Sequence, residues 1–118
     1  MVYRVDISDQ ANEDIDEALT WIARHSETSA NKWLQALLTA FTSLEQMPNR
    51  CPIAPESIGL LIEVRYLIFG EYTLQHRIIF GVSVDDRSEN GIVTIYRVRN
   101  SRQRPLTGLE LLGNYGDE

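Results

Sequence analysis

Three short, strand-like segments in the second half of the chain each contain arginine within them. They comprise residues 63–70, 76–80 and 93–102 of the 118-residue sequence. Segments of this kind usually have their charged residues at the ends of the strand and not inside it. The internal arginines make this region the most informative part of the chain, and the fold has to accommodate them.

The first half of the chain is predicted to form a strand followed by a helical hairpin. Apolar and polar residues alternate over 2–7, which indicates a half-buried strand. Apolar residues then recur at helical spacing and predict helices near 9–24 and 28–47. The short break between them makes the two helices antiparallel, and Pro48 ends the second.

The second half is predicted to form three further strands after a proline-containing loop at 49–59. These strands are expected near 61–69, 72–84 and 92–100. Gly70 and Glu71 are expected to make a tight turn between the first two strands. Residues 113–118 are expected to be a frayed tail.

This order of elements predicts an α+β fold of one domain, residues 1–118. The N-terminal strand and a three-stranded antiparallel meander form one small sheet, and the helical hairpin covers one of its faces. The N-terminal strand must pair with one of the later strands, and the pattern leaves open which one. The residues expected to be buried between helix and sheet are Trp33, Leu37, Phe41, Leu44, Ile78, Phe80 and Val82.

The composition excludes several classes of protein. Cys51 is the single cysteine, so an internal disulfide or a multi-cysteine zinc site is excluded. The sequence contains no phosphate-binding glycine loop and no HExxH motif, and we expect no cofactor and no metal. Because we find neither a signal peptide nor a membrane-spanning segment, we expect a cytoplasmic protein without a membrane partner.

The net charge of −6 is unevenly distributed. Residues 1–50 carry four basic and eight acidic side chains, whereas residues 60–104 carry seven arginines and five acids. The strand region is therefore mildly basic although the chain as a whole is acidic. This balance argues against bulk binding of nucleic acid, but it leaves open a local site for anions.

Strand alternation places Arg77 on the face opposite the helices, beside Ile79 and Gly81. Two interpretations of Arg77 remain open. It lies in a shallow concave site on the open face of the sheet, or it pairs with Glu63 or Glu71 at the end of a strand. His76 is expected to point away from Arg77, and His25 is interpreted as a solvated residue in the break between the helices.

A cluster of arginines occupies the last strand and its end. Arg97 and Arg99 share one face of this strand, and Arg102 and Arg104 follow it. Such a cluster can hold phosphates or the carboxylates of an acidic peptide.

Short motifs along nearly the whole chain resemble those of the RelE/ParE family, the toxins of bacterial type II toxin–antitoxin pairs. At the N-terminus the resemblance lies in Tyr3-x-Val5-x-Ile7-Ser8-x-x-Ala11-x-x-Asp14-Ile15, and in the second helix in Ala30-x-x-Trp33 and Leu44-x-x-Met47-Pro48. In the strands it lies in Glu63-Val64-Arg65-x-Leu67-x-x-Gly70, His76-Arg77-Ile78-Ile79-Phe80, Val98-x-Asn100-x-Arg102 and Arg104-Pro105-Leu106. The resemblance implies a growth-inhibiting toxin that a cognate antitoxin neutralises.

Members of the family act on two kinds of target. RelE-type toxins cleave mRNA on the ribosome with strand arginines and lysines and a C-terminal tyrosine or histidine. ParE-type toxins lack this set and inhibit DNA gyrase. Lys32 is the single lysine of this chain, and there is no histidine or tyrosine between Tyr96 and Tyr115. The chain also has Asn100 where ParE-type members commonly have histidine. Asn100 is thus a departure from the ParE pattern, whereas the low lysine count and the acidic balance of the chain favour the ParE type and a function without catalysis.

The resemblance also implies roles for particular residues. In a metal-independent endoribonuclease, Arg77, Arg102 and Arg65 would be catalytic. In either type of toxin, the antitoxin or the target would bind at Arg97, Arg99, Arg104, Leu106 and Leu109. A homodimer and a toxin–antitoxin hetero-oligomer both fit, and so does a decayed toxin that binds only its antitoxin.

Overall fold

The computed structural model describes residues 2–60, 62–84 and 90–112. Along the chain it contains β1 (Tyr3–Ile7), α1 (Asp9–His25), α2 (Glu27–Leu44), β2 (Arg65–Phe69), β3 (His76–Val84), β4 (Gly91–Asn100) and α3 (Gly108–Leu111), with 3-10 turns at Pro48–Arg50, Pro55–Ser57 and Tyr72–Leu74. The predicted tail at 113–118 lies outside the described residues.

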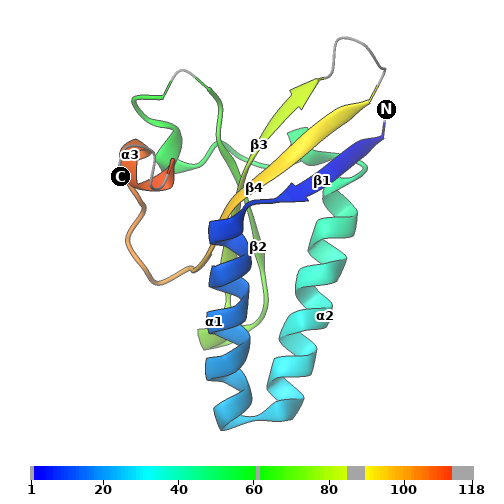
Figure 1. Ribbon diagram of the computed structural model, residues 1–118, viewed down its shortest axis with the longest axis vertical. Helices are drawn as coiled ribbons and strands as arrows, with labels where there is room; N and C mark the ends of the chain where they lie inside the picture. Colours follow the sequence, from blue (N-terminus) through cyan, green and yellow to red (C-terminus); the bar gives the residue numbers. More distant parts are fainter. Residues whose placement is uncertain (1, 61, 85–89, 113–118) are drawn as a thin grey trace.

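Two serines define the helical hairpin. The side chain of Ser8 accepts a hydrogen bond from the Ala11 amide at 3.1 Å and caps α1. Ser26 ends α1, because its amide donates to the Ile22 carbonyl, and it also caps α2 through its hydroxyl. With a single residue between them, α1 and α2 run antiparallel and side by side (Figure 1). The break predicted between residues 24 and 28 was therefore too long, and α2 ends three residues before the predicted 47.

The four strands form one mixed sheet in the order β1-β4-β3-β2. The three later strands make the predicted antiparallel meander, and β1 pairs with β4 in parallel. β2 starts at Arg65 instead of near residue 61, which itself is not described. The predicted tight turn at Gly70 and Glu71 was wrong, because a 3-10 turn at Tyr72–Leu74 lengthens the connection to β3.

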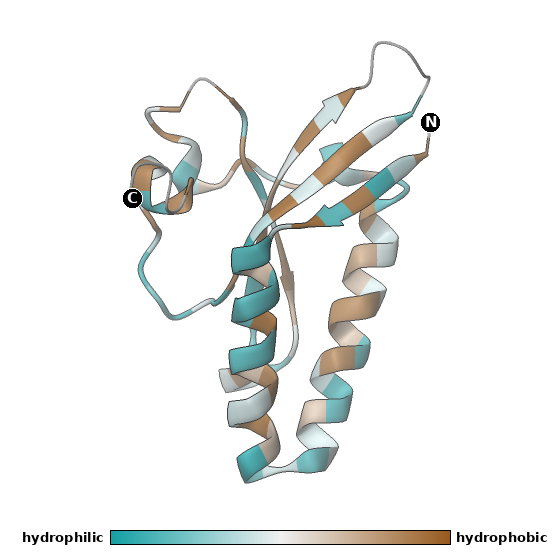
Figure 2. Cartoon of the chain, in the orientation of Figure 1, coloured by the Kyte–Doolittle hydropathy of each residue, from teal (hydrophilic) through white to brown (hydrophobic). Residues whose placement is uncertain are grey.

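The main core lies between the helical hairpin and one face of the sheet. Trp33, Leu37 and Leu44 are buried there against Ile78 and Phe80, as predicted. Phe41 and Val82 are only half-buried, although both pack against this core. Figure 2 colours the residues by hydropathy and shows the hydrophilic residues of the hairpin concentrated along α1.

A second, smaller core covers part of the opposite face of the sheet. It contains Ala54, Val64, Ile79, Leu106 and Leu111, which come from the loop before β2, from β3 and from the C-terminal segment that ends in α3. Figure 1 shows this segment folded back beside the sheet. The expectation of an open face around Arg77 and Ile79 was therefore wrong, because both residues are buried. In the described part of the chain, no helix is both long and apolar enough to cross a membrane.

Candidate functional site

A β-bulge in β4 sets the direction of the arginines that follow it. Ile79 lies opposite Arg97 and Phe80 lies opposite Ile95, so that Tyr96 is the extra residue of β4. The ring of Tyr96 packs over Gly81, where a Cβ atom would come within 3.0 Å of it. A side chain at position 81 would therefore require the Tyr96 ring to shift by a few tenths of an ångström. Beyond it, Arg97 and Arg99 line one cleft together.

Arg97 is neutralised within the chain by a carboxylate on α1. Its guanidinium donates two hydrogen bonds to Asp14, at 2.7 and 2.9 Å. Oδ2 of Asp14 also accepts a hydrogen bond from the Val98 amide at 2.9 Å, so one side chain joins α1 to β4. The hydrogen bonds that Arg97 donates to Asp14 raise the pKa of Arg97 above its ordinary value, despite partial burial. The charge of Arg97 is therefore largely balanced within the chain, and two of its hydrogen-bond donors are already bound to Asp14.

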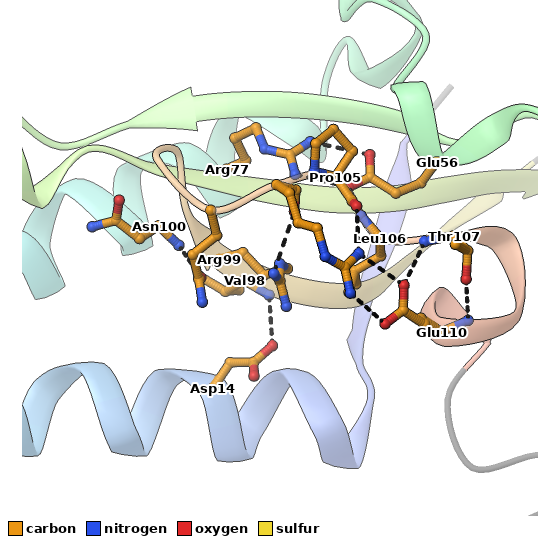
Figure 3. A network of polar contacts seen from close by, with 12 residues as sticks. Asp14, Glu56, Arg77, Val98, Arg99, Asn100, Pro105, Leu106, Thr107 and Glu110 are labelled. Atoms are coloured by element: carbon orange, nitrogen blue, oxygen red, sulfur yellow. Dashed lines mark hydrogen bonds and ion pairs between the residues drawn. The ribbon is translucent and has the colours of Figure 1, made fainter.

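Arg77 is held in a buried ion pair with Glu56. Its two terminal nitrogens donate to the two carboxylate oxygens at 3.1 and 2.8 Å, and the Leu106 amide donates to the same carboxylate at 3.0 Å. Figure 3 shows the three groups meeting beside the C-terminal segment. Burial raises the pKa of Glu56, but the hydrogen bonds from Arg77 and Leu106 outweigh it and hold this pKa below its ordinary value.

The sequence-based partners of Arg77 were wrong. Glu63 instead binds Arg65 at 3.1 Å, and Glu71 lies exposed in the connection to β3. Sequence reasoning missed Glu56, because the residue stands in an irregular, proline-containing loop 21 positions before Arg77. The sequence indicated Asp14 only as part of the N-terminal motif. The helical spacing that placed Asp14 near the start of α1 carries no information on its partner Arg97 in β4.

Arg99 differs from its two neighbours because no carboxylate binds it among the described residues. Its Nε atom is buried without a hydrogen-bond partner there, and Nη2 makes a single long contact of 3.4 Å to the Arg104 carbonyl. It lies directly opposite Arg77 in the pairing of β3 with β4. Burial and the nearby positive charge of Arg97 lower the pKa of Arg99. Figure 3 shows Arg99 between the Arg77–Glu56 pair and Asp14.

Arg99 lines a cleft of about 450 Å³ between α1 and the end of β4. Asp14, Glu17 and Trp21 contribute to it from α1, and Arg97, Arg99 and Asn100 from β4. We call this space the α1–β4 cleft. Its walls combine two arginines, two acids and an exposed indole, so it offers both charge and apolar surface to a bound molecule.

His76 is buried on the helix side of the sheet, as its predicted direction away from Arg77 requires. Its ring packs against Trp33 and Phe69. Nδ1 lies 2.8 Å from the Leu74 carbonyl and 3.2 Å from the Trp33 indole nitrogen. One atom cannot donate and accept together, and the shorter contact favours Nδ1–H donating to Leu74. Burial lowers the pKa of His76, so the ring is held in its neutral form.

Two further candidate residues differ in burial, since Arg65 is half-buried and Arg102 is exposed. Arg65 binds the Cys51 carbonyl and Glu63 near the start of β2. The Arg102 side chain is exposed beyond the end of β4. Arg65 and Arg102 share no side-chain partner with Arg77 among the described residues, and the catalytic role of the three arginines stays a prediction.

The candidates in the C-terminal segment have different environments. Arg104 forms an exposed ion pair with Glu110 at 2.9 Å, and the hydrogen bonds from Arg104 lower the pKa of Glu110 to about 2. Leu106 is buried in the second core and is not available to a partner, whereas Leu109 is 85% exposed. Of the two leucines, only Leu109 can contact another molecule without movement of the segment.

The arrangement of strand, helical hairpin and meander is that of the RelE/ParE-like fold. A solved structure titled as the chromosomal ParDE toxin–antitoxin system from P. aeruginosa is similar with a TM-score of 0.58 and 16% identity, over 84% of this chain and 96% of that one. The family model described as the ParE toxin of type II toxin–antitoxin systems, parDE, matches residues 5–105. The chain therefore belongs to the ParE toxin family. No curated protein matches the sequence.

Proposed function

We propose that this toxin inhibits growth by binding DNA gyrase, without catalysis, and that a cognate antitoxin neutralises it. The observation that favours this function is the state of Arg77. A ribonuclease would need its guanidinium to reach the scissile phosphate, but both terminal nitrogens are bound to Glu56 in a buried pair. A phosphate would have to displace that carboxylate and the C-terminal segment that covers it.

The chemistry of the neighbouring groups supports the same proposal. Cleavage of RNA needs a base for the 2′-hydroxyl and an acid for the leaving oxygen. Arginine stays protonated and serves poorly in either role. His76 is buried between Trp33 and Phe69 on the helix side of the sheet, away from Arg77. The net charge of −6 also opposes approach to ribosomal RNA, whereas a protein target tolerates it.

The test is to induce the chain in cells with a DNA-damage reporter and to map transcripts by primer extension in the same cultures. Purified chain is added in parallel to a gyrase supercoiling assay. Growth arrest with a DNA-damage response, intact transcripts and loss of supercoiling activity would support gyrase as the target.

The matched variant is Arg102→Ala, because Arg102 is exposed and its loss leaves the buried ion pairs intact. Codon-phased mRNA cuts that disappear in Arg102→Ala, with no DNA-damage response, would replace the gyrase proposal by the ribonuclease. A chain that binds its antitoxin but arrests no cells would identify a decayed toxin and overturn the gyrase proposal.

A further inference from the structure

The three arginines around the bulge differ in how their charge is balanced. Arg77 binds Glu56 through two hydrogen bonds, and Arg97 binds Asp14 through two. Arg99 lies between these pairs, and its Nε–H group is buried with no hydrogen-bond acceptor among the described residues. Leaving a buried donor of a charged group without an acceptor costs more than leaving a neutral one. We therefore expect an arginine with such an unpaired donor at a place where a ligand supplies the missing acceptor.

Arg99 lines the α1–β4 cleft. Asn100 and Gln103 add amide groups beside Arg99, while Trp21 and Leu74 provide apolar surface. Trp21 is 56% exposed, and its ring lies 4.5 Å from the ring of His25 between centroids. A ligand with one negative group and an adjacent apolar group would satisfy both kinds of surface.

We propose that the α1–β4 cleft binds one carboxylate side chain of an acidic segment of the antitoxin, and that Arg99 is the residue that receives it. This inference rests on the proposed function, since it names the contact by which the partner is held. Once the Arg99 side chain turns toward the cleft, because its Nε is buried in the free chain, the carboxylate accepts hydrogen bonds from Nε and a terminal nitrogen in a two-pronged pair. An apolar side chain next to it covers Trp21.

The charge of the cleft favours a carboxylate over a phosphate chain. Asp14 and Glu17 line the α1 wall of the cleft, and Asp14 already occupies Arg97. With Asp14 and Arg97 balancing each other, successive phosphates would therefore meet one unbalanced arginine and the carboxylate of Glu17. A single carboxylate needs only Arg99, and the neighbouring residues of a protein segment bring no further charge. RNA is accordingly the alternative that the experiment has to exclude.

The cleft can be tested without the antitoxin. The probe is a capped pentapeptide with one glutamate between leucines, titrated into nitrogen-15-labelled chain while the arginine Nε–H signals are followed by NMR. The Arg99 signal, assigned by its loss in Arg99→Gln, is expected to shift on titration. A glutamine version of the peptide is expected to bind about tenfold or more weakly, the usual effect of losing a charged hydrogen-bond pair.

Arg24→Gln is the matched control, because it removes the same charge from an exposed position on α1 outside the cleft. It is expected to bind the glutamate peptide as the unmodified chain does, whereas Arg99→Gln is expected not to. A second readout separates binding from folding. Arg99→Gln is expected to keep or raise the melting temperature of the free chain, because it removes a desolvated charge. A lowered melting temperature with unchanged peptide binding would show that Arg99 is merely structural.

Two other outcomes would overturn the inference. If a single-stranded RNA oligonucleotide or inorganic phosphate shifts the Arg99 signal and the glutamate peptide does not, the cleft is a phosphate site. If the small protein encoded beside this chain is co-expressed and binds Arg99→Gln and unmodified chain equally tightly, the carboxylate contact is wrong while the proposed antitoxin pairing stands. If that protein does not bind at all, the pairing fails and the inference fails with it.

Discussion

Glu56 is the side chain on which the polar contacts beneath the C-terminal segment converge. It is 1% exposed and accepts three hydrogen bonds, two from Arg77 and one from the Leu106 amide. A buried ion pair gains little over a well-packed apolar pair, because both charges lose their hydration. Removing one partner alone strongly destabilises the fold, because the remaining charge stays buried without compensation.

We therefore expect Glu56→Gln to lower the free energy of unfolding by about 3–5 kcal/mol, measured by urea unfolding at pH 7. The control is Glu63→Gln, which removes the same charge from a pair whose carboxylate is largely exposed. That change is expected to cost less than about 1 kcal/mol. Equal costs for the two variants would contradict the central place of Glu56.

The acid side of the stability profile depends on His76 and Glu56. Burial holds the pKa of His76 below its ordinary value, so the unfolded chain takes up this proton more readily than the folded one. Stability from His76 is then complete above the ordinary histidine pKa and is lost as pH falls through the lower, folded value. Glu56, whose pKa is also lowered, contributes a further loss at more acidic pH.

The expected result is a fall in the urea midpoint between about pH 7 and pH 5, with a smaller fall over this interval in His76→Gln. Unfolding is followed by tryptophan fluorescence, because Trp33 packs directly against His76. A midpoint that stays constant to pH 5 in the unmodified chain would show that the imidazole does not titrate with folding.

Among the elements, patterns local in sequence were predictable and pairings distant in sequence were not. Alternation gave the faces of the strands correctly, which is why Phe80 and Ile78 were placed in the main core. It carries no information on the partner of a strand, so the parallel pairing of β1 with β4 appeared only in the structure. The same limit applies to Asp14 and Arg97, which lie 83 positions apart and meet only because α1 packs beside β4.

The junction of the two helices depends on Ser26, which belongs to both. Because it ends α1 and caps α2 through its hydroxyl, Ser26→Ala is expected to cost about 1 kcal/mol, whereas Ser26→Gly is expected to cost only a few tenths relative to serine. Thr28→Ala in the exposed first turn of α2 is the control, and urea unfolding is the measurement. A larger cost for glycine than for alanine would show that backbone freedom, and not capping, controls the turn.

At the scale of the whole molecule, the sheet is covered on both faces by different parts of the chain. The helical hairpin covers one face, and the loop before β2 covers part of the other together with the C-terminal segment. The sequence predicted the first layer because its apolar stripes are long and regular. The second layer rests on isolated residues such as Ala54 and Leu111 in irregular segments, where no period indicates burial.

The two leucines once grouped as binding residues should therefore behave in opposite ways. Leu106 is 7% exposed and packs in the second core, so Leu106→Ala is expected to cost about 2–5 kcal/mol of unfolding free energy. Leu109, on the same segment, is 85% exposed, and Leu109→Ala is expected to change stability by less than about 0.5 kcal/mol. If Leu109 contacts the antitoxin or gyrase, its loss should weaken that binding alone.

The measurements are urea unfolding of both variants and their affinity for the co-expressed partner. If Leu106→Ala is as stable as the unmodified chain, the C-terminal segment does not fold with the rest of the molecule, and the burial of Arg77 beneath it has to be reconsidered.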